Sequence, residues 1–419
     1  MSHHPPVPRD PWLASLTLVT AFTALVLYRL ATPSIAYFDE VHYLPAARAM
    51  LEGGPFLNRE HPVLGKALIA AGIATFGDTA FGWRFPSAIA AAIGLLAAMR
   101  AMWLASKRRF ATLAFGLLMS TGFALFVQAR IAMLDMFMAA FVAIALWQCA
   151  AAVREPEQGA LRLLAAGAAL GLALASKWNA APLAVLPGLA FLACRVPYAG
   201  WHTLTARRGP PVPGVPLWLA AILLGAVPLV VYGTSFMLQD GMKVGDVLAH
   251  QFEMARMQRG VIEPHPYQSG WQEWVLNWRA IWYLYEPVDG AQRGVLLIGN
   301  PLTVLLGLPA LGWCAWMALM KRRAAEIAVV VLYAVSLGFW IVADKPVQFY
   351  YHYFLPGSFL LGALALALDT LWARGRRWLA VLPLVGSAAL FAWFYPILSA
   401  APLSGPGAFA QWMWLDSWR

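Results

Sequence analysis

The sequence predicts an all-α polytopic membrane protein with about 11 transmembrane helices and two large outer loops. The first observation is composition, because 61% of the 419 residues are hydrophobic and only 12% are charged. The second is the recurrence of apolar runs close to the ~20 residues that cross a bilayer. The third is that short basic clusters separate these runs. So small a polar share excludes a disordered chain, a disulfide-rich secreted fold and a cytoplasmic enzyme.

Each predicted span is an apolar run compatible with a transmembrane helix. The fifth and sixth runs are short and are also compatible with one broken pair. There is no internal repeat and no appended soluble domain, so we interpret residues 1–419 as a single integral membrane domain. The predicted spans are 11–30, 84–106, 111–128, 136–153, 161–176, 179–195, 214–236, 294–318, 324–343, 353–371 and 378–398.

The basic clusters predict the orientation of the chain. Clusters such as Lys107–Arg109 and Lys321–Arg323 lie in alternate connections, and the positive-inside rule makes those connections and the N-terminus cytoplasmic. The outer face then holds the loops 31–83 and 237–293, the C-terminal tail and most of the acidic residues. Because the net charge of +10 is spread over these clusters, no nucleic-acid partner is expected.

Two features near apolar segments have ordinary interpretations. Ser34–Ala36 resembles a signal-peptidase site, but the apolar stretch before it is long for a signal peptide, so an anchor helix is preferred. The three cysteines (Cys149, Cys194 and Cys314) lie within or at the end of apolar spans, without metal-ligand spacing. We interpret them as small buried hydrophobic residues and predict no metal site.

The first outer loop begins with two adjacent carboxylates, Asp39 and Glu40, at the end of the first span. Carboxylates at a membrane edge are costly unless they are paired or used. One interpretation is a solvated loop start. The other is a general base beside a second acid that orients an acceptor, since partial removal from water raises carboxylate basicity.

Three further charged residues lie near predicted span ends. Lys66 ends the segment His61–Lys66, in which Gly65 permits close approach, and it fits an interface anchor or a ligand contact. Arg130 departs from the positive-inside pattern, and a guanidinium suits bidentate capture of phosphate. Asp135, five residues later, would point to another helix face and fits either a helix N-cap or a site residue.

The second outer loop carries His265–Ser269 and then an aromatic run, in which Trp and Tyr predict an interfacial helix, an aromatic belt or a sugar-stacking surface. Lys177 and Lys345 interrupt apolar sequence at outer turns. No D-x-D, G-x-G-x-x-G or P-loop motif is present. This absence favours a sugar donor carried on a membrane lipid over a cytosolic nucleotide sugar.

Together these motifs resemble the protein O-mannosyltransferase family, which has the GT-C glycosyltransferase fold and uses polyprenyl-phosphate sugars. The resemblance covers roughly residues 10 to 395 and is specific because six short motifs follow in order on the predicted outer face. The motifs are Phe38–His42, His61–Lys66, Arg130 to Asp135, Ser176–Trp178, His265–Ser269 and Ile298–Pro301.

The resemblance implies a role for each candidate residue. Asp39 would be the general base, Glu40 would position the acceptor, and Asp135 would support the site. Arg130 would bind the lipid phosphate of the donor. The remaining donor contacts to phosphate or sugar would be Lys66, His61, Lys177, His265 and Tyr267.

The resemblance also implies a cellular setting. Val63 departs mildly from the family pattern, and the second loop is too short for the β-trefoil domain of eukaryotic members, so the chain resembles a compact bacterial member. The site would then face the periplasm at the inner membrane, with a polyprenyl-phosphate sugar as donor, a secreted or periplasmic protein as acceptor, and membrane lipid around it. No cofactor is required by this chemistry, and a divalent metal is not expected, although Asp39 and Glu40 could hold one.

The sequence is also compatible with other functions to different degrees. Within the same fold, the chain could transfer a sugar to a lipid or glycan, as aminoarabinose-to-lipid A transferases do. A transporter with Asp135 as proton carrier is disfavoured because repeated halves and interrupted helices are missing. A structural scaffold would not need Asp39 and Glu40 at a lipid boundary.

Overall fold

A computed structural model describes residues 9–260, 263–343 and 345–419. Within these residues, nine helices are long and apolar enough to cross a membrane. The helices are α1 (Trp12–Leu27), α2 (Glu40–Leu51), α3 (Leu64–Phe76), α4 (Ala80–Ser106), α5 (Arg109–Thr121), α6 (Ala124–Ala129), α7 (Leu134–Arg154), α8 (Gly159–Ser176), α9 (Ala181–Ala199), α10 (Leu217–Ala221), α11 (Val227–Ser235), α12 (Asp246–Arg259), α13 (Trp271–Val275), α14 (Pro301–Lys321), α15 (Ala324–Val342), α16 (Phe354–Ala373) and α17 (Arg377–Leu398). The two strands are β1 (Ile281–Val288) and β2 (Ala291–Leu297).

The predicted multi-span helical architecture is confirmed. The fifth and sixth predicted spans are the separate helices α8 and α9. The predicted spans 11–30 and 111–128 coincide with shorter helices. α1 has 16 residues, and the second run divides into α5 and α6 at Phe123, whose φ is 71°.

The outer loops contain more structure than the sequence predicted. The loop 31–83 holds α2 and α3, and the loop 237–293 holds α12, α13 and most of an antiparallel hairpin. The two-stranded sheet is thus an addition to the predicted helical fold. An Asp-Gly turn at Asp289 and Gly290, with φ of 50° and 73°, joins β1 to β2, and such turns match the twist of a hairpin.

The aromatic run of the second loop does not form an interfacial helix. After the short helix α13 it enters β1, where Trp282, Tyr283 and Leu284 are buried. The predicted span 294–318 likewise begins late, because β2 continues to Leu297 and α14 starts at Pro301.

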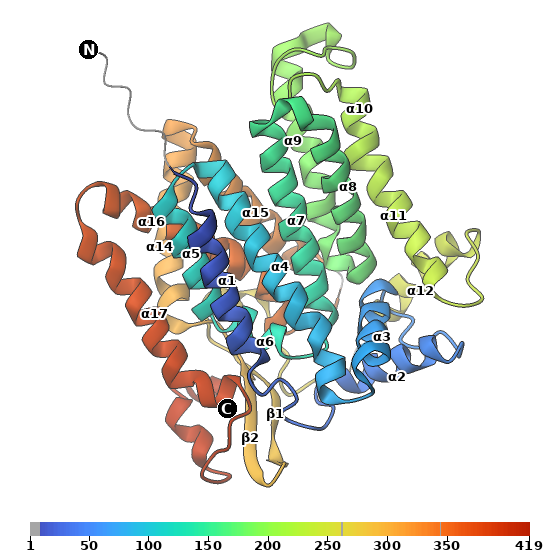
Figure 1. The fold of residues 1–419 in the computed structure, drawn as a ribbon, viewed down its shortest axis with the longest axis vertical. Helices are drawn as coiled ribbons and strands as arrows, with labels where there is room; N and C mark the ends of the chain where they lie inside the picture. The colour runs from blue at the N-terminus through green and yellow to red at the C-terminus, as the bar shows by residue number, and fades with distance from the viewer. Residues whose placement is uncertain (1–8, 261–262, 344) are drawn as a thin grey trace.

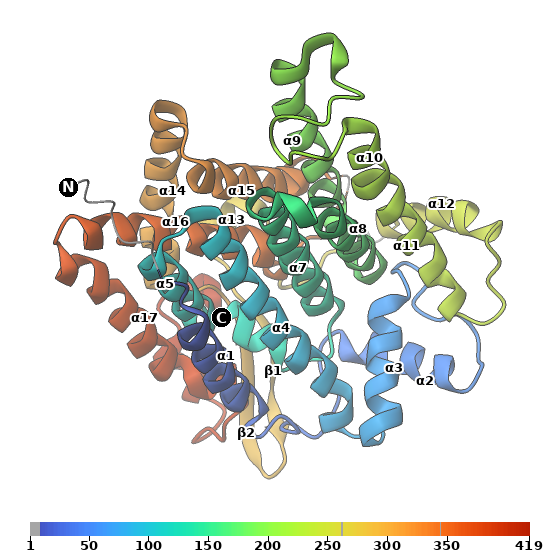
Figure 2. The same ribbon diagram turned by 45° about the horizontal axis from the view of Figure 1, so that its top comes forward.

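The connections between the long helices lie at the two opposite ends of the helical bundle (Figure 1). The hairpin, α2 and α3 lie at one end with the C-terminus, and the connection between α9 and α10 lies at the other. The tilted view shows α4, α7 and α8 as neighbouring helices (Figure 2). The hairpin and the two helices of the first outer loop thus share one end of the molecule.

Candidate active site

The two adjacent carboxylates Asp39 and Glu40 have different surroundings. Glu40 is fully buried, and its two oxygens accept from Arg84 Nε at 2.8 Å, Arg84 Nη2 at 2.9 Å, the Ala132 amide at 2.9 Å and the Tyr37 amide at 3.2 Å. With four donors its hydrogen-bonding capacity is filled. The predicted contact of Glu40 with an acceptor is therefore not supported by its geometry.

Arg84 completes a structural unit with Glu40. It is also fully buried, and its remaining donors reach the carbonyl oxygens of Pro33 at 2.6 Å and Ile35 at 2.8 Å. The pair, called the clamp below, joins α4 to the segment before α2, and the Ala132 amide joins it to the start of α7. The clamp thereby positions the chain on either side of Asp39 and the segment that precedes Asp135.

Asp39 is partly exposed and forms no ion pair among the described residues. It is the residue before α2, and Tyr43 Oη donates to its Oδ2 at 3.2 Å. Burial raises the pKa of Asp39, while the positive charge of Lys177 lowers it and the negative charge of Asp135 raises it further. A carboxylate of raised basicity at an accessible position suits a general base.

Asp135 and Lys177 form a buried ion pair next to Asp39. Lys177 Nζ lies 2.6 Å from Asp135 Oδ2 and 4.8 Å from the centre of the Tyr351 ring. Asp135 Oδ1 is buried and has no hydrogen-bond partner among the described residues. The N-cap of α7 is Met133, so the N-cap interpretation of Asp135 was wrong.

Lys345 brings a second positive charge to this region. Burial lowers its pKa to about 8, and the charges of Lys177, Asp39 and Asp135 also act on it. Among the residues that the structure describes, no carboxylate lies within ion-pair distance of Lys345. We call Asp39, Asp135, Lys177 and Lys345 the open cluster.

His61 borders the open cluster. Its ring meets Tyr43 edge to face at 5.9 Å, and burial, followed by the charges of Lys177 and Lys345, holds its pKa well below the usual range. His61 is therefore a neutral imidazole next to two lysines, and its predicted contact with the donor remains a proposal.

Two predicted donor ligands are engaged by backbone carbonyls instead. Lys66 Nζ donates to the carbonyls of Asn58 at 2.6 Å and His61 at 3.0 Å. Arg130 donates to the carbonyls of Tyr28 at 2.8 Å and Arg29 at 2.9 Å, just beyond the end of α1. These contacts hold a loop and a helix end in place, and contacts of Lys66 and Arg130 with phosphate remain a prediction.

The His265–Ser269 segment packs against the chain that carries Lys345. The Ser269 amide donates to the Gln348 carbonyl at 2.9 Å, and Gln268 Nε2 donates to the Pro346 carbonyl at 3.1 Å. His265 is exposed, and Tyr267 is partly buried. The motif thus holds the Lys345 segment in place, while contacts of His265 and Tyr267 with sugar remain a prediction.

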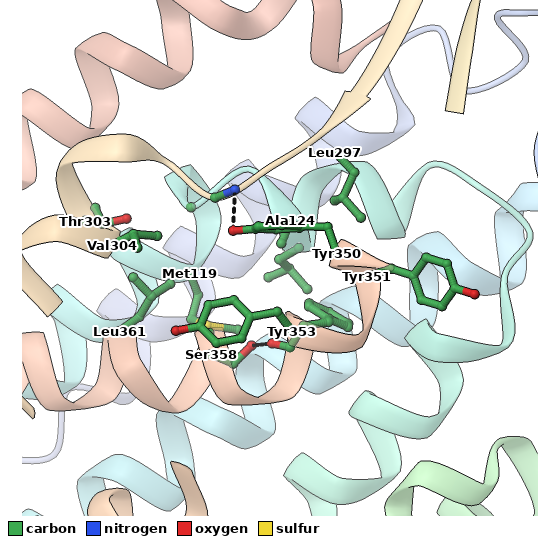
Figure 3. Close-up of a pocket in the computed structure, with 15 residues that line it drawn as sticks. Met119, Ala124, Leu297, Thr303, Val304, Tyr350, Tyr351, Tyr353, Ser358 and Leu361 are labelled. Carbon is green, nitrogen blue, oxygen red and sulfur yellow. Dashed lines mark hydrogen bonds between the residues drawn. The ribbon is translucent and has the colours of Figure 1, made fainter. Parts of the chain in front are cut away.

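A small apolar pocket of about 30 Å³ lies beside the 3-10 helix η6 (Tyr350–Tyr353). Figure 3 shows that Tyr350 and Tyr353 face this pocket, whereas the ring of Tyr351 points away from them. Tyr351 is the ring beneath Lys177. Tyr351 therefore both lines the pocket and contacts Lys177 of the open cluster, so the two sites adjoin at η6.

The open cluster combines the groups that a displacement at a phosphate-linked carbon needs. A partly exposed carboxylate can take a proton, and fixed ammonium groups can stabilise a departing phosphate. Within the described residues, no group of three His, Cys, Asp or Glu side chains is placed to hold a metal ion. Lys177 and Lys345 are the cations of the open cluster that could neutralise a phosphate.

Two models of one family match consecutive parts of this chain. Residues 60–224 match the dolichyl-phosphate-mannose-protein mannosyltransferase model, and residues 243–418 match the C-terminal four-span region of protein O-mannosyltransferase. The chain belongs to the protein O-mannosyltransferase family. This membership confirms the family that the six motifs predicted.

Relatives of this mannosyltransferase family member align over nearly their full length. A polyprenol-phosphate-mannose–protein mannosyltransferase of Mycolicibacterium smegmatis is 28% identical, over 99% of this chain and 94% of its own. The counterpart from Corynebacterium glutamicum is 26% identical, over 97% and 92%.

Solved structures share the fold of this family member. A chain of the Saccharomyces cerevisiae Pmt1-Pmt2 complex bound to the sugar donor matches with a TM-score of 0.82, at 14% identity over 98% of this chain and 93% of that one. ArnT from Cupriavidus metallidurans bound to undecaprenyl phosphate matches with a TM-score of 0.61, at 17% identity over 92% and 65%. These likenesses confirm the GT-C fold.

Sequence reasoning missed the partner of Glu40. Arg84 lies inside α4 and 44 residues from Glu40, so neither spacing nor a motif links the two. An arginine near the outer end of a predicted span was the available signal, because a buried guanidinium there requires a partner.

Proposed function

We propose that this protein transfers mannose from a polyprenyl-phosphate-mannose donor to Ser or Thr hydroxyls of protein acceptors. Family membership makes it a multi-span membrane glycosyltransferase. The two bacterial relatives are named as polyprenol-phosphate-mannose–protein mannosyltransferases, which supports this donor and this class of acceptor. The observation that carries the proposal is the partly exposed Asp39, which has no ion-pair partner among the described residues, beside the buried Lys177 and the partly exposed Lys345.

In the proposed reaction, Asp39 accepts the proton of the acceptor hydroxyl as its oxygen attacks the anomeric carbon. The bond from that carbon to the phosphate oxygen breaks, and the configuration inverts. Lys177 and Lys345 stabilise the charge that develops on the departing polyprenyl phosphate. Asp135 holds the Lys177 ammonium in position through their 2.6 Å contact.

The cellular setting is part of the proposal. Loops with carboxylates and the C-terminus share one end of the bundle (Figure 1). The positive-inside rule assigns that end to the periplasm of a bacterial inner membrane and the N-terminus to the cytoplasm. Lysine neutralisation of the phosphate makes a metal unnecessary in this scheme, and no cofactor takes part.

An acceptor competition tests the proposed function. The purified protein in lipid nanodiscs would receive polyprenyl-phosphate-mannose with labelled sugar, a Ser/Thr-containing polypeptide and lipid A together. Label in the polypeptide is the expected result. Label in lipid A instead would replace the proposal with a lipid glycosyltransferase of the kind that the ArnT likeness suggests, and label in neither acceptor would reject the mannose donor.

A further inference from the structure

His352 has one ring nitrogen occupied and one free. Its Nδ1 accepts a hydrogen bond from the Phe349 amide at 3.1 Å. A neutral imidazole that accepts at Nδ1 carries its proton on Nε2. Among the described residues Nε2 has no hydrogen-bond partner, although His352 is only 2% exposed. An unpaired buried donor is costly, so a ligand that supplies an acceptor would gain from it.

The surroundings hold the imidazole rigidly without satisfying Nε2. The ring stacks on Trp340 at 3.8 Å and lies 4.4 Å from Tyr351 and 5.8 Å from Trp274. These are centroid distances to aromatic rings. Such neighbours fix the plane of the imidazole but offer little to an N–H donor.

The same histidine lies beside the open cluster. The positive charges of Lys345 and Lys177 act on it electrostatically. Tyr351, its ring neighbour, also supports the Lys177 ammonium at 4.8 Å. The free donor therefore lies in the region where the buried Lys177 and the partly exposed Lys345 would gather around an anion.

We infer that His352 Nε2–H donates a hydrogen bond to a phosphate oxygen of the polyprenyl-phosphate donor. This inference rests on the proposed function. Lysine ammonium groups attract a phosphate as point charges without fixing its direction. A stacked, neutral imidazole adds one directed donor, which orients the phosphate and with it the bond that breaks.

A purely structural role for His352 can be separated from this one. That role would need only Nδ1, which caps η6, and the stacked ring. Asn places an acceptor oxygen near the position of Nδ1 and has no distal donor. Gln extends to the position of Nε2 and carries a donor there. The variants His352→Asn and His352→Gln therefore divide the two functions of one side chain.

The test measures dissociation constants of polyprenyl phosphate and of polyprenyl-phosphate-mannose for the purified protein in nanodiscs, with melting temperatures in parallel. His352→Asn is expected to weaken both ligands by the same factor, ~10-fold or more, with little change in melting temperature. His352→Gln is expected to bind more tightly than His352→Asn.

Four outcomes would overturn the inference. Wild-type affinity in His352→Asn would show that Nε2 binds nothing, and equal losses in both variants would assign His352 to structure. A loss restricted to the mannose-bearing ligand would move the contact from phosphate to sugar. Failure of the wild-type protein to bind either ligand would reject the proposed function as well as this inference. Normal binding and transfer by His352→Asn would reject this inference alone.

Discussion

The clamp and the open cluster lie at the same end of the molecule, yet they differ in how completely their charged groups are hydrogen-bonded and paired. In the clamp every oxygen of Glu40 is engaged, and both side chains are fully buried. In the open cluster Asp39 is partly exposed, Asp135 keeps a free oxygen, and Lys345 has no carboxylate at ion-pair distance among the described residues. We interpret charged residues whose hydrogen-bonding capacity is filled as structural. Charged residues that keep a free donor or acceptor are the candidates for catalysis or ligand binding.

The two groups depend on each other. Glu40 directly follows Asp39, and the Ala132 amide that it binds lies three residues before Asp135. The clamp can therefore fix the positions of both acids without contacting substrate. Changes in the clamp should lower stability, and changes in the open cluster should lower catalysis.

The largest expected effect comes from breaking the clamp. Arg84→Met would leave Glu40 buried without a counterion, which typically costs ~3–5 kcal/mol. The matched control is Arg48→Met, because the Arg48–Asp78 pair has side chains 40% and 46% exposed and such surface pairs contribute only ~0–1 kcal/mol. Chemical unfolding in detergent would compare them. Equal losses in the free energy of unfolding would show that the buried pair contributes no more to stability than the surface pair.

Lys177→Met should reduce transfer by about 10²-fold, as loss of one fixed transition-state charge does elsewhere. The charge of Lys177 lowers the pKa of Asp39, so its removal should also move the acid limb of the pH–rate profile to higher pH. Rates measured across pH would show both effects. Lys243→Met, at an exposed position, serves as the control. An acid limb that stays at the wild-type pH would show that the charge of Lys177 does not act on the general base.

Lys345→Met should raise the donor KM by about tenfold, which is the loss of one modest charge contact. Because burial lowers the pKa of Lys345 to about 8, the ammonium binds phosphate below that pH and is lost above it. The wild-type protein should therefore lose donor affinity above pH 8. Lys345→Arg should keep affinity at higher pH, and an identical alkaline limb in that variant would exclude Lys345.

The smallest expected effect tests the packing beneath the open cluster. A Cβ at Gly65 would lie 2.6 Å from Leu134 Cδ2, so Gly65→Ala should destabilise the protein by ~1 kcal/mol through overpacking. Gly188→Ala meets nothing within 4 Å and should be neutral or slightly stabilising. Melting temperatures of the two variants check the difference, and a stabilised Gly65→Ala would contradict it.

The sequence could predict those features that depend on local pattern. Apolar runs predicted the spans, and the order of motifs predicted the family. Asp39, Asp135 and Lys177 were all candidates, and the structure brings them together. Their roles in the reaction remain predictions.

The contacts that the sequence could not predict share a physical cause, because each depends on a partner distant in sequence or on the backbone. The carbonyl oxygens that accept from Lys66 and Arg130 leave no signature in the pattern of side chains. The hairpin could not be told from the neighbouring predicted span because its strands are apolar and adjoin that span. The Asp289–Gly290 pair is a turn sequence that could have indicated it.

The measurement that tests the central claim most directly compares Asp39→Asn with Glu40→Gln, in initial transfer rate and in melting temperature. Burial raises the pKa of Asp39, so its ionised form opposes folding at neutral pH, and Asn should leave stability unchanged or higher. Asp39→Asn should lose transfer by ~10²–10⁴-fold while it stays folded. Glu40→Gln should lose stability because Arg84 is left buried without a counterion. Wild-type transfer by Asp39→Asn, or a stable but inactive Glu40→Gln, would contradict the account.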